Sequence, residues 1–576
     1  MTEPARTADE VRYGAVYAGD TFQLTRKLTL NLGVRVDLQG DWTERFNRIV
    51  AVNPTEASPL LKIDPALAST VNPATGQTFA NLKGRYDLVA SSLHPSRSAF
   101  PAWKNVSPRL GISYQLDRNT VIRSGYGMFY LPVDVRWNDA PHNLFINSFV
   151  TPWLTAQSDG VTPKATLSNP FPGSGITPPF GRNQGLIDVQ GNGNEAPIGN
   201  NPPPYVQQWN LDIQRQFPGN TLVDIAYAGS KGTHLPMHDQ TLNQLQPQYL
   251  PQTGPNAASQ IAFLTQSVNN PFAGNCTGCN GPVISGGMGT NATVKQGQLL
   301  LPYPQLDGFS LSEPDNRDSI YHSLQLKVEK RFSAGAQVLA TYTVSKLIDD
   351  TNSEINWLEA ASPSWNDFDV YNRRSFRSLD GFDVPQRLVI GSVLDLPFGR
   401  GKKFANNMNG VANTIIGGWG VDTIITFQRG FPIIIGGCPG PLSNSGIPGV
   451  GCSRPTKTGA SSLTSGSLET RLTHWFDTSV FTNGTPGVYN YGNDPRSEPN
   501  IRDDGSRNFD FAFFKKTKFG VDDRYGVEFR GEFFNGFNHP QFSPPNTSCC
   551  TGANFGQVTS QYNLPRLIQF GLRMTF

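Results

Sequence analysis

The chain has 576 residues, and its 47 basic and 45 acidic side chains leave a net charge of +2. These charges are spread throughout the sequence, so no basic stripe suggests nucleic acid as a partner, and no run of about 18 apolar residues predicts a transmembrane helix. Apolar residues make up only 37%, whereas 58 glycines, 45 prolines and 36 phenylalanines indicate a β-rich chain with large loops. A disordered chain would carry fewer aromatic residues.

The first predicted hairpin consists of residues 13–23 and 28–38. In its second strand, large aliphatic side chains alternate with mostly polar ones, and Asn31, Arg35 and Asp37 share one face. Successive side chains of a strand point to opposite faces of the sheet. A buried sandwich strand rarely carries such a polar face, whereas a barrel wall between lipid and a wet lumen requires one. The hairpin therefore predicts two strands of a membrane β-barrel.

The same alternation continues along the chain and gives 13 predicted strands in all. The remaining segments are 107–117, 120–131, 205–217, 220–229, 321–332, 336–347, 386–397, 419–430, 508–518, 525–537 and 566–576. Short connections alternate with long polar ones, and aromatic residues gather at strand ends. Outer-membrane barrels are built in this way, with short periplasmic turns, long extracellular loops and aromatic girdles. The sequence thus predicts an all-β, antiparallel transmembrane barrel wall.

The alternation also predicts which side chains face lipid and which face the lumen. We expect the outward side chains to include Leu30, Leu32, Val34, Leu110, Ile112, Leu326, Val328, Phe570 and Leu572. We expect the lumen to receive Arg35, Arg109, Lys327, Arg530 and Arg573. An arginine or lysine facing lipid at mid-depth costs about 2–4 kcal/mol, which disfavours the opposite arrangement.

The last segment, 566–576, has an apolar side chain at every second position and ends on an aromatic residue. The apolar positions are Ile568, Phe570, Leu572, Met574 and Phe576. This strand resembles the C-terminal strand of bacterial outer-membrane barrels, which their assembly machinery reads. The resemblance predicts an outer-membrane location, with lipid and the barrel assembly machinery as partners and these five residues as the assembly signal.

Six cysteines lie in loop-like stretches: Cys276, Cys279, Cys438, Cys452, Cys549 and Cys550. Outside the cell an even number of cysteines favours local or inter-loop disulfides. A metal site at the first pair is the alternative, but no second pair or histidine stands at ligand spacing. Asp349, Asp350 and Glu354 could offer oxygen ligands to calcium, although their spacing is not that of an EF-hand and favours a solvated acidic loop. No catalytic, metal or cofactor site is predicted, and no enzyme activity.

Several short phrases carry a resemblance to a known family. They are S-P-R-L-G at 107–111, R-S-G-Y-G-M-F-Y at 123–130, A-Y-A-G-S-K-G-T-H-L at 226–235, T-Y-T-V-S-K at 341–346, G-G-W-G at 417–420 and F-R-G-E-F-F-N-G-F-N-H-P at 529–540. Together with the terminal strand, they make the chain similar to the C-terminal barrel portion of an Oar-like TonB-dependent outer-membrane receptor. The resemblance implies a 22-stranded barrel with an N-terminal plug and a segment that engages the TonB complex.

The odd strand count indicates either one missed strand or an incomplete chain, and the resemblance implies that residues 1–576 form only the C-terminal portion of such a barrel. Bacterial single-chain barrels have an even number of strands, and the first ten residues are not a signal peptide. We therefore expect the plug, the coupling segment and the export signal to lie outside these residues. The expected structure is an open, curved sheet, or a smaller barrel forced shut between its first and last strands.

Three functions compete at this point. A receptor-transporter would capture an unknown extracellular solute with its long loops for TonB-dependent uptake. An adhesion or surface-structural barrel would use the same loops without transport. A soluble, propeller-like binding protein would show regular sequence repeats, which this chain lacks. The sequence favours the first function over the second and does not reveal the solute.

Overall fold

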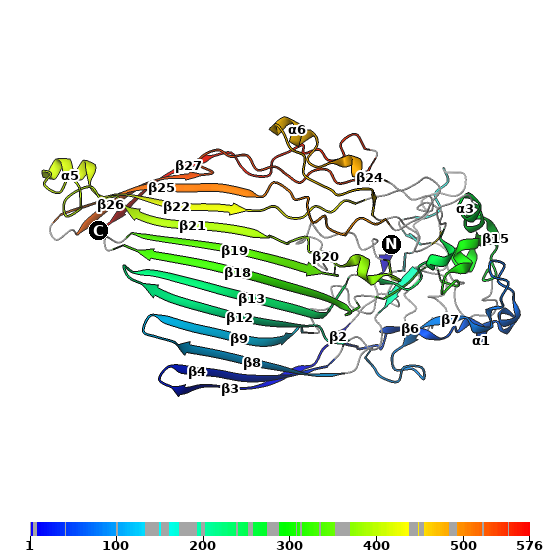
Figure 1. The fold of residues 1–576 in the computed structure, drawn as a ribbon. Helices are drawn as coiled ribbons and strands as arrows, with labels where there is room; N and C mark the ends of the chain where they lie inside the picture. The colour runs from blue at the N-terminus through cyan, green and yellow to red at the C-terminus, as the bar shows by residue number, and fades with distance from the viewer. Residues whose placement is uncertain are drawn as a thin grey trace.

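The structure of this chain is a computed structural model, shown in Figure 1. It describes residues 2–3, 8–40, 42–98, 102–132, 149–150, 161–166, 168–171, 193–196, 202–237, 240–250, 257–273, 287–306, 308–311, 314–332, 336–351, 369–436, 447, 454–482, 492–520, 524–550 and 552–576. One large antiparallel sheet dominates the molecule. Its short turns lie at one end, and its long loops gather in a layer at the other end (Figure 1).

Thirteen long strands form this sheet, and their order in space is their order in the chain. They are β3 (Tyr13–Thr25), β4 (Leu28–Gln39), β8 (Trp103–Gln115), β9 (Thr120–Tyr130), β12 (Tyr205–Phe217), β13 (Thr221–Leu235), β18 (Arg317–Arg331), β19 (Gln337–Asp349), β21 (Gln386–Asp395), β22 (Trp419–Gln428), β25 (Ser506–Phe519), β26 (Tyr525–Phe534) and β27 (Leu567–Thr575). A short strand, β20 (Ser378–Leu379), pairs with the loop end of β19. All thirteen predicted strands are confirmed. β8, β13 and β18 extend several residues further toward the loops than predicted, because their polar ends break the alternation while still pairing.

The pairing register places the two predicted sets of side chains on opposite faces of the sheet, while the assignment of the apolar face to lipid stays a prediction. Directly opposed residues in an antiparallel pair share a face, and Leu32 is opposed to Leu110 while Leu326 is opposed to Tyr342. The expected lumen residues occupy the other face throughout, as Arg530 does opposite Gly571. The edge strand β3 holds an exception, because Asp20 is opposed to Leu32 and so lies on the apolar face.

The sheet is open in the part of the chain that the structure describes. Its two ends are β3 and β27, and these strands do not pair with each other. In Figure 1 they lie at opposite borders of the sheet. This arrangement is the open sheet that the sequence predicts. That the sheet belongs to a larger, 22-stranded barrel stays a prediction.

Most of the buried apolar side chains lie in the loop layer, because one face of the wall is reserved for lipid. One cluster includes Val50, Tyr86 and Phe309, and a second includes Trp475 and Phe476. The elements of this layer are β6 (Val50–Ala57), α1 (Leu60–Ile63), β7 (Lys83–Leu88), β11 (Gly193–Ala196), β14 (Gln240–Thr241), α3 (Ala257–Thr265), β15 (Ser267–Asn269), α4 (Gly287–Thr290), β16 (Thr293–Lys295), β17 (Gly308–Leu311), β23 (Thr456–Lys457), α6 (Leu468–Thr473) and β24 (Phe481–Thr482). Four further two-residue strands form two pairs, β1 (Thr2–Glu3) with β10 (Phe149–Val150) and β2 (Asp9–Glu10) with β5 (Thr43–Glu44). The described parts of the loops are thus packed structures rather than open connections.

The longest connection at the turn end joins β21 to β22 and contains the helix α5 (Gly410–Ile416). Asn409 caps this helix by accepting a hydrogen bond from the Ala412 amide. The indole Nε1 of Trp419 donates to the Ile415 carbonyl over 2.9 Å, which ties α5 to the first residue of β22. No helix among the described residues has both the length and the apolar character needed to cross a bilayer.

Candidate functional site

The lumen face of the wall carries a network of paired charges. Arg530 on β26 lies 2.8 Å from Asp422 on β22 and 3.3 Å from both Glu528 and Glu532. One guanidinium thus balances part of the charge of three carboxylates across neighbouring strands. These side chains are partly exposed, so solvent screens the pairs and each contributes little to stability. The network makes the lumen face polar and wettable.

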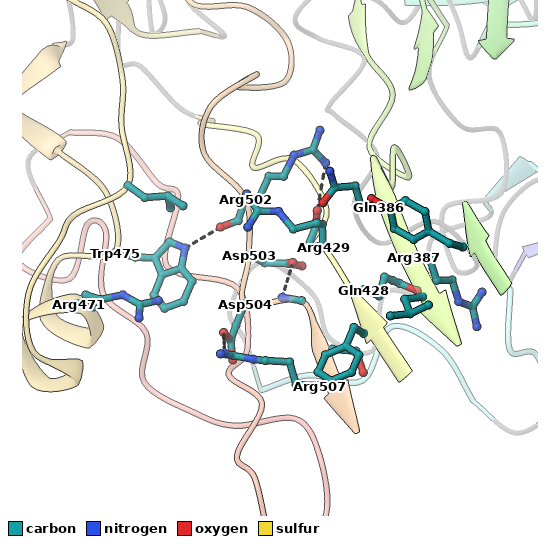
Figure 2. A pocket seen from close by; sticks show the side chains of 17 residues that line it. Gln386, Arg387, Gln428, Arg429, Arg471, Trp475, Arg502, Asp503, Asp504 and Arg507 are labelled. Carbon is teal, nitrogen blue, oxygen red and sulfur yellow. Dashed lines mark hydrogen bonds and ion pairs between the residues drawn. The ribbon is translucent and has the colours of Figure 1, made fainter. Parts of the chain in front are cut away.

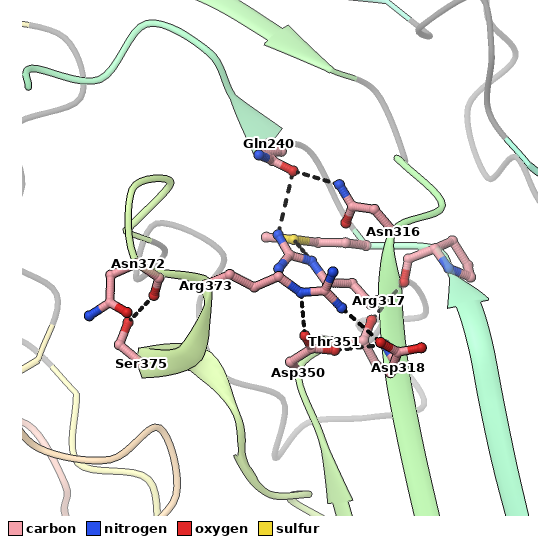
Figure 3. Close-up of polar contacts among 11 residues, drawn as sticks. Gln240, Asn316, Arg317, Asp318, Asp350, Thr351, Asn372, Arg373 and Ser375 are labelled. Carbon is pink, nitrogen blue, oxygen red and sulfur yellow. Dashed lines mark hydrogen bonds and ion pairs between the residues drawn. The ribbon is translucent and has the colours of Figure 1, made fainter.

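A cluster of charged residues closes the loop end of β18 and β19 (Figure 3). Arg373 donates to Asp350 over 2.6 Å and to Asp318 over 3.0 Å, and the Asp318 amide donates to Asp350 over 2.6 Å. Beside them, Arg317 is only 1% exposed, and its Nε lies 3.1 Å from the sulfur of Met237. The cluster joins the loop that contains Arg373 to the ends of two strands.

The residues Asp349 and Asp350 are buried, so the predicted solvated acidic loop is wrong for these two positions. Asp349 is paired with the buried Arg496, which reaches it from a loop far along the chain. The third residue of that prediction, Glu354, lies outside the described residues. A buried carboxylate needs a partner charge or hydrogen bonds to remain ionised, and both aspartates have one.

Two neighbouring buried carboxyl groups, Asp494 and Glu498, share a site in the loop layer. Burial and the adjacent Glu498 raise the pKa of Asp494 to about 9. Burial opposes ionisation of Glu498 as well, but the neighbouring Asp494 carboxyl group and hydrogen bonds from Lys457 and Ser461 hold its pKa below the usual range. The Lys457 ammonium lies 2.7 Å from Glu498 Oε1. At neutral pH the pair therefore holds one proton.

A cavity of about 430 Å³ opens where β21, β22 and β25 enter the loop layer (Figure 2). Tyr342, Leu388 and Phe427 supply its apolar floor, and Leu463 and Trp475 supply a loop wall. The cavity is also lined by five arginines: Arg387, Arg429, Arg471, Arg502 and Arg507. Two aspartates, Asp503 and Asp504, are the acidic lining residues. Apolar surface beside guanidinium groups suits an anion that carries an apolar part.

The arginines of this cavity differ in how they are held. Arg502 is buried and donates to Asp383 over 2.6 Å, and Arg507 donates to Asp504 over 2.8 Å. The Arg471 guanidinium lies 5.0 Å from the ring centroid of Trp475. Arg429 is exposed, and the described residues offer it no ion-pair partner. Burial raises the pKa of Asp503 to about 6. Below this pH Asp503 is mostly neutral and competes less with an anionic ligand for the arginines of the cavity.

The five predicted assembly residues lie on or just after β27 and are all exposed. Leu572 is opposed to Phe529, and the Phe570 ring stacks on the Phe529 ring with centroids 6.0 Å apart. Both contacts belong to the lipid-facing surface. The role of these residues as an assembly signal stays a prediction.

Of the six cysteines, Cys549 and Cys550 are described, and they are bonded to each other. Cys276, Cys279, Cys438 and Cys452 lie outside the described residues, so their pairing stays a prediction. Within the described ranges, no group of three or more histidine, cysteine, aspartate or glutamate side chains could hold a metal ion.

Sequence reasoning missed the buried arginines Arg317, Arg496 and Arg502, together with the cavity that Arg502 lines. No local pattern marks them, because each pairs with a residue distant in the sequence, as Arg502 does with Asp383. The one available signal is an excess of arginine over lysine in the loops before β25, since arginine is the cation preferred in buried pairs.

Comparison with known proteins gives one family match. The family described as "Outer membrane beta barrel domain" matches residues 2–569. A search of curated proteins finds no match. Solved structures that are similar to this chain include the ferripyoverdine receptor of Pseudomonas aeruginosa, with 9% identity, a TM-score of 0.35, and coverage of 98% of this chain and 39% of that chain.

Two Escherichia coli structures are also similar. The ferric-catecholate import receptor Fiu from strain K12 has 10% identity, a TM-score of 0.37, and coverage of 99% of this chain and 45% of that chain. The outer membrane transporter YddB has 9% identity, a TM-score of 0.40, and coverage of 99% of this chain and 54% of that chain. The chain therefore spans about half the length of these proteins or less.

Proposed function

The chain belongs to the outer membrane beta barrel domain family, and we propose that it is the barrel portion of a receptor that captures an extracellular solute for TonB-dependent uptake. Its place is the bacterial outer membrane, with the apolar face of the wall against lipid and the charged face toward the lumen. The short turns then lie in the periplasm and the loop layer outside the cell.

One observation carries the proposal: a polar lumen wall leads directly into a loop layer whose described residues are packed together. Buried pairs such as Arg496 with Asp349 and Arg502 with Asp383 hold long loops over the strand ends. Ordered loops keep a binding surface in one arrangement and so reduce the entropy lost on capture. A charged lumen face gives a hydrophilic solute a wet path past the lipid.

The proposal extends to a larger protein that contains residues 1–576. In it, a 22-stranded barrel would close between β3 and β27 through further strands, a plug would fill the lumen, and a coupling segment would engage TonB. The open sheet supports this part, because an unpaired strand edge within lipid costs several kcal/mol for each unsatisfied backbone group. Reading the coding sequence upstream of residue 1 tests it. A continuous frame that encodes a plug is expected, and a stop codon directly upstream would contradict it.

Transport is tested in the bacterium that carries the gene. Mass spectrometry would follow the depletion of solutes from a defined medium by wild-type cells, a deletion strain and a strain with inactive TonB. We expect at least one solute to be depleted by wild-type cells alone. Rescue of the deletion strain by the complete gene is the control.

The second candidate function is adhesion without transport, which the extent of the packed loop layer favours. It predicts that the deletion strain loses attachment to other cells or surfaces, while inactive TonB has no effect and the medium is depleted equally by all strains. That result would replace the transport proposal.

A further inference from the structure

The floor of the arginine-lined cavity belongs to the lipid-facing side of the wall. Leu388 is opposed to Tyr342 on β19 and to Phe427 on β22, so the three side chains share one face. Tyr342 is in turn opposed to Leu326, which lies on the lipid-facing side. Arg387 and Gln428 point the other way and border the cavity from the lumen side. The apolar floor of the cavity therefore continues the lipid-facing surface at the extracellular end of β21 and β22.

Three of the lining arginines, Arg429, Arg471 and Arg507, stand above this floor. Arg507 is directly opposed to Phe427 and so points to the lipid side. Arg429 directly follows β22, and Arg471 comes from α6 in the overlying loop. Asp504 is paired with Arg507, and Asp503 is the other acidic group of the lining. The rim thus carries more positive than negative charge at the loop ends of β22 and β25.

We propose that this cavity binds the phosphorylated glucosamine head group of an outer-leaflet glycolipid. A phosphate would be held by Arg429, Arg471 and Arg507, because guanidinium groups bind phosphate oxygens in a bidentate manner. An acyl chain would lie along Tyr342, Leu388 and Phe427, while Trp475 and Leu463 cover the sugar from the loop side. The site joins a cationic rim to a lipid-exposed apolar floor, an arrangement that a free anion would not need.

This inference goes beyond solute capture, since it assigns a lipid to a site on the outside of the wall. It requires only the membrane location that the family establishes, and it holds whether or not the protein transports anything. A bound glycolipid would brace the loop that contains α6 against the membrane.

The test uses the protein purified in detergent from the outer membrane of its own bacterium, within the complete gene product. Co-purified glycolipid is measured by mass spectrometry in the wild type and in the double variant Arg429→Gln/Arg471→Gln. Loss of charge-assisted hydrogen bonds to phosphate should lower the bound glycolipid by about tenfold or more. The matched control is Arg374→Gln/Arg377→Gln, two exposed arginines outside the cavity, and it should retain the wild-type amount. Equal glycolipid in both double variants would overturn the proposal.

Competition between added ligands shows whether the bound phosphate belongs to a glycolipid, to a phospholipid or to a free anion. Lipid A should bind to delipidated protein, whereas inorganic phosphate should not compete with it, and phosphatidylglycerol should compete only weakly. Phe427→Asn should weaken lipid A binding although all arginines remain. Competition by inorganic phosphate as effective as that by lipid A would show a free-anion site and overturn the proposal, as would equal competition by phosphatidylglycerol. If the double variant is not assembled in the outer membrane, the co-purified glycolipid is measured in Arg429→Gln instead. This single variant should still assemble, because the exposed Arg429 side chain contributes no buried packing.

Discussion

Arg502 and Asp383 form a buried ion pair that joins two long loops at the extracellular end of the wall. The Nη2 atom of Arg502 lies 2.6 Å from Asp383 Oδ2, and its Nη1 also donates to the carbonyls of Asp383 and Gly430. The Trp475 indole donates to the Arg502 carbonyl over 2.7 Å. A single arginine thus links the segments before β21, after β22 and before β25.

Removal of one partner of this pair should destabilise the loop layer without unfolding the wall. Asp383→Ala leaves Arg502 buried without its counter-charge, a change that typically costs about 3–5 kcal/mol. Hydrogen exchange of residues 369–385 and 492–505 should accelerate, while exchange of β21 and β22 stays slow. The control is Glu10→Ala, which removes an exposed pair with Arg12 and should change nothing. Unchanged exchange in Asp383→Ala would mean that packing alone holds the loops.

The Asp494 and Glu498 pair should make loop stability depend on pH. An unfolded aspartic acid loses its proton near pH 4, whereas folded Asp494 keeps its proton up to about pH 9. The folded state therefore binds more protons between these values, so its stability falls as the pH rises through this interval. Glu498 has the opposite effect on the stability of the folded state, but only at lower pH, because its pKa is lowered.

Asp494→Asn should flatten this pH dependence, because asparagine has no proton to lose. The measurement is the rate of hydrogen exchange in residues 454–482, corrected for intrinsic exchange, at several values between about pH 5 and pH 8. Glu469→Gln on the exposed side of α6 serves as the control and should keep the wild-type slope. A variant slope equal to that of the wild type would refute the assignment of the shared proton.

Two neighbouring positions on β18 test which face of the wall meets lipid. Leu326 lies on the apolar face and Gln325 on the lumen face. Leu326→Arg should lower the free energy of unfolding in bilayers by about 2–4 kcal/mol, as an arginine does at mid-depth. Gln325→Arg should change it by no more than about 0.5 kcal/mol. Denaturant titration in lipid vesicles measures both, and the reverse order of effects would invalidate the facing.

Trp419 should stabilise the connection that contains α5, whereas the stability of the sheet should not depend on it. Its indole donates to the Ile415 carbonyl, and its ring receives the Lys515 ammonium at 5.2 Å from the centroid. Trp419→Ala should expose residues 397–418 to proteolysis from the periplasmic side, since a hydrogen bond of about 1 kcal/mol and the ring contacts are lost. Heat-modifiable migration should be unchanged, and the matched control is Phe332→Ala, which removes an exposed aromatic side chain at another turn. Loss of the folded form in Trp419→Ala would assign this residue to the wall instead.

The strands of the wall could be predicted from the sequence, because the alternation of apolar and polar residues that marks each strand lies within that strand. In β4, one face is apolar and the other holds Asn31, Arg35 and Asp37, and lipid on one side with water on the other allows only one facing. Short turns then bring consecutive strands together, so chain order becomes sheet order. The same logic places Leu572 outward and Arg573 inward on β27 without any knowledge of distant residues.

The loop layer and its cavity were decided only by the tertiary structure. Asp349 and Asp350 have the local sequence of a solvated acidic loop, yet Arg496 and Arg373 reach them from distant segments and allow their burial. The lipid-side cavity likewise needs Arg471 from α6 above Phe427 from β22. No periodic sequence pattern marks such pairs. A buried charge is stabilised by the partner that the folded chain brings within hydrogen-bonding distance, and this partner need not be near it in the sequence.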